Sequence, residues 1–541
     1  MFFVSEDELD VGFNYIKNFS ESKFFPTPFE IEAIDHSWKD IKPILSKIDL
    51  DTYLISKWHK IFALKENLAT RPIYVLDPLD SIYFTAIILK IAPSVEPLRI
   101  PEDEKIIFSF RYKKNKSGDP IFESDYNKFY EAIKQKSEQK YIGFADIADF
   151  YPRIYLHRLE NALADIPGIE DEKRIIMKFL TNWSENTSYG IPIGIDASNY
   201  LGEISLMEVD EFLSSYQIDY ARYIDDFYFF SREKEEVRKS ILILSKRIHE
   251  TQGLTLNGEK SYIKKSGEVL KDFKRPRAVE KKISRRIIKE VFDGNPYKEV
   301  DFDNLPADQK KLINSIDIAV SLKKALSFDS IDIRSVNFLL NLMTALRRPI
   351  FINLIIKNLA NLIPASKTVY RLLNAYEDQE SEQLKKIGNT ILTYLTSDPN
   401  SSFITELQKI WLLELFKNSN QWDNIDLLRK LLRNERQDLA LRQTILAIGE
   451  IGNRSAILDL KSMYNNVGIW CKRAIIYAMR NLPKDEMKNF YGTLQIYKAI
   501  KNEKDGTAKV NWSPKIDQTR TSCDNILLIA TLLYAKEIIR K

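Results

Sequence analysis

The chain has 541 residues, with 80 Lys and Arg against 76 Asp and Glu, and only 17 Gly and 20 Pro. This length allows two or three domains, because single hydrophobic cores stop growing near about 250–300 residues. The low Gly and Pro content favours a helix-rich protein and excludes collagen-like, low-complexity and wholly disordered chains. Two cysteines, Cys471 and Cys523, exclude a disulfide framework, and four histidines argue against a Cys/His zinc site, so carboxylates must hold any metal.

No membrane-spanning segment is predicted from the sequence. The longest apolar runs, such as Ile526–Ala535, are about half the roughly 20 residues that a membrane helix needs. The acidic first ten residues lack the basic flank and long apolar region of a signal peptide. We therefore expect a cytoplasmic protein without a membrane partner.

Four parts are predicted along the chain. Aromatic residues broken by prolines in residues 1–50 predict a short N-terminal helical segment, and short apolar runs between turn residues in 51–235 predict a mixed α/β region. Residues 236–295 are expected to form connecting helices, and amphipathic periodicity in 296–541 predicts an all-helical region. The strand candidates are Ile73–Leu76, Ile106–Phe110, Tyr141–Asp146 and the residues around Asp225–Asp226.

Positive charge is concentrated between Lys260 and Lys289. Twelve Lys and Arg residues accompany three acids there, so this segment carries +9 and the other residues sum to −5. A charge of this density favours a polyanionic partner, and the alternative is a solvated helix surface.

One internal repeat is visible in the helical part. Leu441–Gly452 and Cys471–Leu482 align at an offset of 30 residues, and both combine an apolar stripe with small residues for close packing. Pairs of helices that repeat about every 30–47 residues are typical of α-solenoids of the HEAT type. An irregular helical bundle is the alternative, and this part of the sequence contains no carboxylate or nucleophile constellation.

Three aspartates stand out in the α/β part. Asp146 ends the apolar strand candidate Tyr141–Asp146 and is followed by the aromatic pair Phe150–Tyr151. Asp225 and Asp226 lie between two apolar and aromatic runs, which predicts a β-hairpin with both acids at its tip. Adjacent acids inside an apolar hairpin are costly unless a cation neutralises them.

These carboxylates suit a pair of metal ions. Three hard oxygen ligands from two strands can hold two Mg²⁺ ions about 3.5–4 Å apart, which bind the attacking and leaving oxygens of a phosphoryl transfer, and Mn²⁺ can substitute. The ions also cancel charge on an incoming triphosphate. A solvent-exposed turn is the alternative for Asp225 and Asp226 alone, but the spacing of 79 residues from Asp146 and the preceding Tyr223 make the pattern far more specific.

With these motifs, the sequence resembles the reverse transcriptases across residues 60–265. The segments that carry the resemblance are Lys65 with Arg71, Ser109–Tyr112, Asp146 with Tyr151, Gly190–Ser198, Tyr223–Asp226 and Gly253–Ser261. The resemblance implies an α+β right-hand polymerase, with fingers and palm at 51–235 and the segment 1–50 packed on the fingers. A basic thumb-like segment would follow at 236–295, and a HEAT-like α-solenoid at 296–541.

The resemblance also implies a role for each matched residue. Asp146, Asp225 and Asp226 would be catalytic and would hold two Mg²⁺ ions. The dNTP-binding residues that it implies are Lys65, Arg71, Arg111, Ile147, Tyr151 and Lys260. Nucleic-acid contacts are expected from Lys264, Lys265, Lys274 and Arg275. A sugar-gate position for Tyr151 would select deoxynucleotides, whereas an ordinary surface role for Lys65 and Arg71, or a core role for Tyr151, is the alternative.

The departures from the family pattern indicate a subfamily. Ile193 stands where many reverse transcriptases have Gln, and the helical part 296–541 replaces any nuclease or maturase domain. This domain order resembles the abortive-infection (Abi) reverse transcriptases, a bacterial phage-defence group. That resemblance implies template-independent DNA synthesis by a homo-oligomer, primed by a tyrosine so that single-stranded DNA stays covalently attached, with a phage or host protein as trigger. The motifs do not identify the priming residue among 26 tyrosines.

Two other functions compete with this interpretation. A template-dependent, RNA-directed DNA polymerase would keep the same aspartates and metals. A non-catalytic RNA- or protein-binding scaffold is the alternative from another class. The intact Asp146, Asp225, Asp226, Lys65 and Arg71 argue against the scaffold, because a decaying site has no chemical reason to keep five charged groups.

Overall fold

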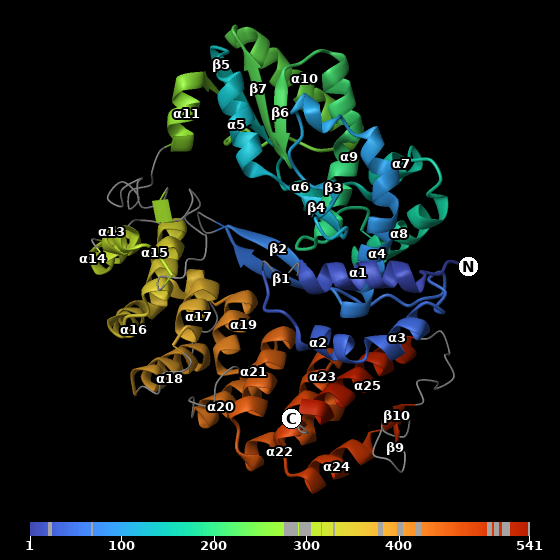
Figure 1. The fold of residues 1–541 in the computed structure, drawn as a ribbon, viewed down its shortest axis with the longest axis vertical. Coiled ribbons are helices and arrows are strands. Elements are labelled where there is room, and N and C mark those ends of the chain that lie inside the picture. The colour runs from blue at the N-terminus through green and yellow to red at the C-terminus, as the bar shows by residue number, and fades with distance from the viewer. Residues whose placement is uncertain are drawn as a thin grey trace.

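A computed structural model places most of the chain (Figure 1). It describes residues 1–19, 24–65, 69–185, 187–274, 290–291, 304–314, 316–327, 331–376, 382–397, 404–417, 424–494, 500–502, 508–510 and 520–538. The contacts and elements given below are those of these residues.

A four-stranded antiparallel sheet forms the centre of the first half, in the order β6-β7-β5-β8. Its strands are β5 (Tyr141–Asp146), β6 (Tyr220–Tyr223), β7 (Asp226–Ser231) and β8 (Tyr262–Lys265). The β-branched and aromatic residues of these short runs favour strands, and β5 has the bounds predicted for it. Strand β8 comes after residue 235, so this sheet extends beyond the predicted end of the palm.

Alternate residues of the sheet enter two different cores. Phe227 and Phe229 of β7 lie in the main core, while Tyr228 and Phe230 belong to a smaller one. The helices α9 (Asp196–Ser215) and α10 (Lys234–Gln252) share the main core, and α5 (Tyr126–Lys136) and α11 (Ser266–Lys274) cover the other face. Helices therefore cover both faces of the sheet, while the edge strand β8 stays partly exposed along its length.

The remaining elements of the first half surround this sheet. Hairpin β1 (His59–Leu64) and β2 (Thr70–Val75) is followed by the core helix α4 (Pro78–Val95). The smaller elements are α1 (Glu6–Asn18), α2 (Phe29–His36), α3 (Trp38–Leu45), β3 (Arg111–Lys114), β4 (Pro120–Glu123), α6 (Phe150–Arg153), α7 (Leu156–Ala164) and α8 (Glu170–Trp183). Helix α1 packs on α4, and this contact ties the N-terminal segment to the first half of the chain.

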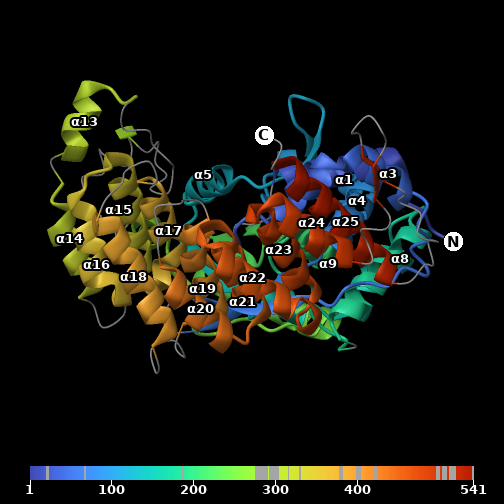
Figure 2. The same ribbon diagram turned by 90° about the horizontal axis from the view of Figure 1, so that it is seen from below.

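The second half is a stack of helices, here called the helical stack. In one row, each helix packs on the next: α15 (Ile333–Leu346), α17 (Ser366–Asn374), α19 (Glu406–Glu414), α21 (Asp438–Ile451), α23 (Ile469–Ala478) and α25 (Arg520–Ile538). The helices before and between them are α13 (Ala307–Asn314), α14 (Ile318–Leu326), α16 (Ile350–Leu362), α18 (Glu382–Thr396), α20 (Ile425–Asn434), α22 (Arg454–Met463) and α24 (Lys484–Thr493). Figure 2 shows the stack running past the first half from α13 to α25.

The predicted repeat is a real packing contact inside this stack. Its two copies lie mainly on α21 and α23, which are neighbours. Gly449 is needed where they cross, because a Cβ at that position would lie 2.5 Å from the Cβ of Ala478. The prediction of an all-helical second half misses one small hairpin, β9 (Ile500–Asn502) with β10 (Ala508–Val510).

The helical stack docks on the N-terminal segment and on the β1–β2 hairpin. Helix α25 packs against α2, and α19 packs against β1 (Figure 1). An apolar cluster fills the second contact, formed by Ile61, Ala63, Ile73, Ile410, Leu439 and Trp470. Ile193 packs against the same cluster.

One sequence expectation, a strand, needs correction here. Residues 106–110 do not form a strand, since they make one isolated bridge, at Ile107, and Phe110 has a φ of +44°. One stretch, Pro78–Leu98, is long and apolar enough to cross a membrane, although 83% of its apolar window is buried inside the protein. It is longer than the apolar run Ile526–Ala535, and its burial is that of a core helix.

Candidate active site

The three predicted aspartates come together at one end of the sheet. Asp146 is the last residue of β5 and lies directly opposite Asp226, the first residue of β7. Asp225 lies in the two-residue loop before Asp226, and its carbonyl accepts a hydrogen bond of 3.2 Å from the backbone N–H of Ile147. Antiparallel pairing of β5 with β7 thus joins two motifs that lie 79 residues apart in the chain.

Burial and like charge disfavour ionisation of these acids. Burial first, and then the carboxylate of Asp146, raise the pKa of Asp225 to about 6. Burial and the carboxylates of Asp225 and Asp146 raise the pKa of Asp226 to about 7. Carboxylates crowded in this way take up a cation favourably, which is the property of a metal site and not of a solvated turn.

Lys260 supplies part of the positive charge that these carboxylates require. The Nζ atom of Lys260 lies 2.9 and 3.0 Å from the two carboxylate oxygens of Asp146. Nearby, the backbone N–H of Asn257 donates a 2.7 Å hydrogen bond to the carbonyl of Asp146. Arg71 on β2 adds favourable charge near Asp225. The segment Gly253–Ser261 therefore contacts the first aspartate directly.

The chemistry of these donors fits a divalent ion, although they are not gathered into a finished metal site. In the described parts of the chain, no group of three or more His, Cys, Asp and Glu side chains is arranged to hold a metal. At the three aspartates the ammonium group of Lys260 sits against Asp146, so an ion bound there would replace or displace it. The three carboxylates, two of which have a pKa raised by burial and then by their neighbours, still form a hard-oxygen donor set that suits Mg²⁺.

Three other predicted dNTP residues lie close to this end of the sheet. Lys65, at the end of β1, pairs with Asp149 at 3.3 Å. Ile147 is buried, and its backbone N–H donates the hydrogen bond to the carbonyl of Asp225. The hydroxyl of Tyr151 is buried without a hydrogen-bond partner among the described residues, and burial raises the pKa of Tyr151 well above its usual value. An unpaired buried hydroxyl is costly, which is consistent with a ligand-binding position.

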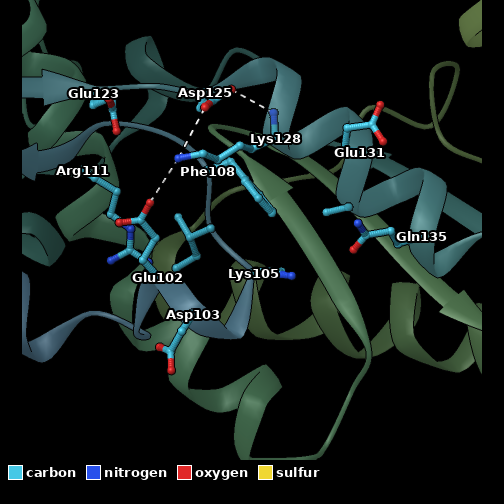
Figure 3. Close-up of a pocket in the computed structure, with 12 residues that line it drawn as sticks. Glu102, Asp103, Lys105, Phe108, Arg111, Glu123, Asp125, Lys128, Glu131 and Gln135 are labelled. Carbon is cyan, nitrogen blue, oxygen red and sulfur yellow. Dashed lines mark hydrogen bonds and ion pairs between the residues drawn. The ribbon is translucent and has the colours of Figure 1, made fainter.

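Arg111 is not brought together with the aspartates. Its guanidinium pairs with Glu96 at 2.8 Å and donates to the carbonyl of Ile100. It lines a cavity of about 670 Å³ beside β3, β4 and α5, shown in Figure 3. The charged lining residues are Glu102, Asp103, Glu123, Asp125 and Glu131 against Lys105, Arg111 and Lys128, and this acidic balance is unfavourable for a triphosphate.

The predicted nucleic-acid residues are only partly described. Lys265 is exposed at the end of β8, and Lys264 lies 4.4 Å above the ring of Tyr262. Residues 275–289, which include Arg275 and make up half of the basic segment, lie outside the described residues, as does the side chain of Lys274. The role of this segment stays a prediction.

Sequence reasoning missed a buried polar network beneath the hairpin. Arg222 of β6 donates to both carboxylate oxygens of Asp210 and of Glu203, two acids on α9. Arg99 donates a 2.7 Å bond to the same Glu203. A signal was present, because charged residues inside the otherwise apolar β6 and α9 must be paired when they are buried.

A comparison with protein families agrees with this geometry. Residues 64–271 match the family described as "Reverse transcriptase (RNA-dependent DNA polymerase)". No curated protein matches the chain. Among solved structures, the apo telomerase of Candida tropicalis is 13% identical, with 66% of this chain and 69% of that one covered and a TM-score of 0.30.

A second solved structure is the telomerase of Candida albicans with a TWJ fragment of telomeric RNA. It is 12% identical, with 85% of this chain and 70% of that one covered and a TM-score of 0.28. Similarity at this level does not inform the function. The family match spans both aspartate motifs and ends in α11. The chain therefore contains a reverse transcriptase domain at residues 64–271.

Proposed function

We propose that this protein is a DNA polymerase of the reverse transcriptase type, with Asp146, Asp225 and Asp226 as its catalytic residues. The observation that carries the proposal is the direct pairing of Asp146 with Asp226 inside the matched domain. The three carboxylates would hold two Mg²⁺ ions, which when bound lower the pKa of an attacking hydroxyl and stabilise the leaving pyrophosphate. Mn²⁺ would support the same reaction.

The surrounding residues would hold the nucleotide. Lys65 and Arg71 lie on the β1–β2 hairpin, and their charges suit the triphosphate. Lys260, now against Asp146, would turn to the nucleotide when metal ions take its place. The ring of Tyr151 would lie beside the sugar and exclude a 2′-hydroxyl. Arg111 has the least support as a nucleotide-binding residue, because its guanidinium is already paired with Glu96.

We further propose that the DNA synthesis is independent of a template, is primed by a tyrosine of the protein, and serves abortive infection against phages in the cytoplasm. This step rests on the resemblance to the Abi reverse transcriptases and on the helical stack that follows the domain. The position of Ile193 supports it, since an apolar side chain packed against Trp470 and its neighbours cannot replace the polar contact of a Gln. A homo-oligomer and a phage or host trigger belong to the same proposal, and a HEAT-like repeat is the proposed class of the stack.

The experiment is incubation of the purified protein with each labelled dNTP or NTP and Mg²⁺, without template or primer. Products are separated on a denaturing gel before and after protease treatment. Label from dNTPs that grows on the protein band and is released by protease as a peptide-linked ladder supports the whole proposal.

Other outcomes separate the alternatives. Label that requires added RNA and a primer, with a product sequence that follows the RNA, would make the protein a template-dependent polymerase. No incorporation under any of these conditions would contradict the enzymatic proposal and favour a non-catalytic RNA- or protein-binding role.

A further inference from the structure

The loop that carries Asp225 has a strained backbone. Ile224 and Asp225 connect β6 to β7, and Ile224 has a φ of +58°. A two-residue hairpin loop with positive φ only at its first residue has the pattern of a type II′ turn, where Gly is usual. A β-branched residue is unfavourable in this conformation, so other groups must hold it there.

Both backbone groups of Ile224 are held by buried side chains. Its N–H donates a 2.9 Å hydrogen bond to Oγ of Ser109, and its carbonyl accepts a 2.9 Å bond from Arg222. Arg222 belongs to the hairpin itself. Ser109 lies 115 residues earlier, in the segment that leads to β3, so it fixes the loop from outside the hairpin.

Ser109 is itself fixed at both its side chain and its backbone. Its hydroxyl donates a 2.7 Å bond to Glu203, and its carbonyl accepts a 3.0 Å bond from Arg99. Arg99 also donates to Glu203, as does Arg222. Ser109 and Arg222 are fully buried, and the side chains of Glu203 and Arg99 are each 1% exposed. A buried polar network with these bonds is rigid, and it transmits its position to the loop.

The loop position determines where the catalytic carboxylates lie. Asp225 directly follows Ile224 in the chain, and the residue after it, Asp226, pairs with Asp146 across the sheet. We propose that Ser109 is a positioning residue for catalysis, whose hydroxyl holds the Ile224 turn so that Asp225 and Asp226 face Asp146. The proposal deepens the polymerase function above and rests on it.

The test compares Ser109→Ala with Ser109→Thr and with a matched control. Ser205→Ala removes the hydroxyl of another buried serine, which among the described residues bonds only to the backbone of its own helix, α9, at the carbonyl of Gly202. Each variant is also made in an Ile224→Gly background, because Gly adopts positive φ without strain and needs no external hold. The readouts are kcat and KM for dNTP, Mn²⁺ binding followed by electron paramagnetic resonance without nucleotide, and thermal unfolding.

The expected result is a change in chemistry without a change in nucleotide affinity. Ser109→Ala should lower kcat and Mn²⁺ affinity by about 10–100-fold, with KM changed less than about threefold, as for other residues that orient metal ligands. Ser109→Thr should recover most of the loss, and Ser205→Ala should behave as the parent. In the Ile224→Gly background the effect of Ser109→Ala should fall below about threefold.

Three results would overturn the proposal. One is wild-type kcat and Mn²⁺ binding in a folded Ser109→Ala variant. Another is an equal loss from Ser109→Ala in the Ile224 and Ile224→Gly backgrounds, which would indicate a general packing defect. If the parent protein incorporates no nucleotide, the polymerase proposal fails separately, and unchanged Mn²⁺ binding in Ser109→Ala would then refute the positioning role on its own.

Discussion

Two buried arginines, Arg222 and Arg473, lie in different regions of this molecule, and they differ in how completely their guanidinium groups are bonded. Beneath the β6–β7 hairpin, all three guanidinium nitrogens of Arg222 are bonded, to Asp210, Glu203 and the carbonyl of Ile224. Where the helical stack meets the first half, Arg473 pairs with Asp77 at 2.8 Å, but its Nε and NH1 atoms have no partner in the described part of the chain. A fully bonded buried guanidinium specifies one geometry, whereas an incompletely bonded one adds little net stability.

This difference indicates which kind of interaction stabilises each region. The hairpin depends on polar bonds, because its strained turn has one acceptable position. The contact with the helical stack combines an apolar cluster around Trp470 and the stacking of Phe29 on Tyr477 at 4.5 Å with a second buried arginine, Arg442, which is fully bonded to Glu30 and Gln443. We therefore expect replacement of Arg222 to lower the stability of the protein more than replacement of Arg473 does.

Arg222→Met tests the hairpin network and should have the largest effect on stability. It leaves Glu203 and Asp210 buried with less positive charge to balance them. Breaking a buried network in this way costs about 3–5 kcal/mol of unfolding free energy. Chemical denaturation measures the change, and a loss below about 1 kcal/mol would show that the network is not important for stability.

Arg473→Met is the matched substitution at the contact with the helical stack and should cost less. Asp77 keeps its bond to the backbone N–H of Leu79 at the start of α4, and the substitution removes two unpaired buried nitrogens. We expect a loss of about 1–3 kcal/mol, which the same denaturation experiment measures. If this variant is as destabilised as Arg222→Met, the contrast between the two regions is wrong.

Lys17→Ala should cause the smallest change in unfolding free energy and serves as a reference for the two arginine variants. Lys17 and Asp35 form a surface ion pair at 2.8 Å, and both side chains are 44% exposed. Solvent screens such a pair, so the unfolding free energy should change by less than about 1 kcal/mol. A larger change at low and high salt alike would mean that the denaturation experiment reports something other than local contacts.

Much of the four-stranded sheet could be predicted because its signals are local. Tyr141–Asp146 is continuous and apolar, and it is a strand with the predicted bounds. The acids at 225–226 interrupt two aromatic runs, and they do lie at a hairpin turn, with Asp226 beginning β7. The order of the family motifs predicts that the aspartates meet at one end of the sheet, and the pairing of Asp146 with Asp226 agrees with it.

The missed features depend on contacts between distant segments. Ser109 meets Ile224, and Arg442 of the helical stack meets Glu30, which lies 412 residues earlier. No periodicity in either segment specifies such a pair. Residues 106–110 do not form the expected strand, also because of a contact with a distant segment. Ile107 makes its single bridge with Arg222 of β6, and Phe110 has a positive φ, so Ser109 between them lies beneath the loop.

The most direct measurement is nucleotide incorporation by the parent protein and by Asp225→Asn combined with Asp226→Asn, with Mg²⁺ present and then removed by a chelator. Asp171→Asn, at a side chain 72% exposed in a surface pair with Arg174, is the matched control. Amides keep the size of the carboxylates but lose the charge that holds a metal. We predict incorporation by the parent and the control that depends on the metal, and none by the folded double variant. Undiminished incorporation by the double variant would contradict the assignment of the active site.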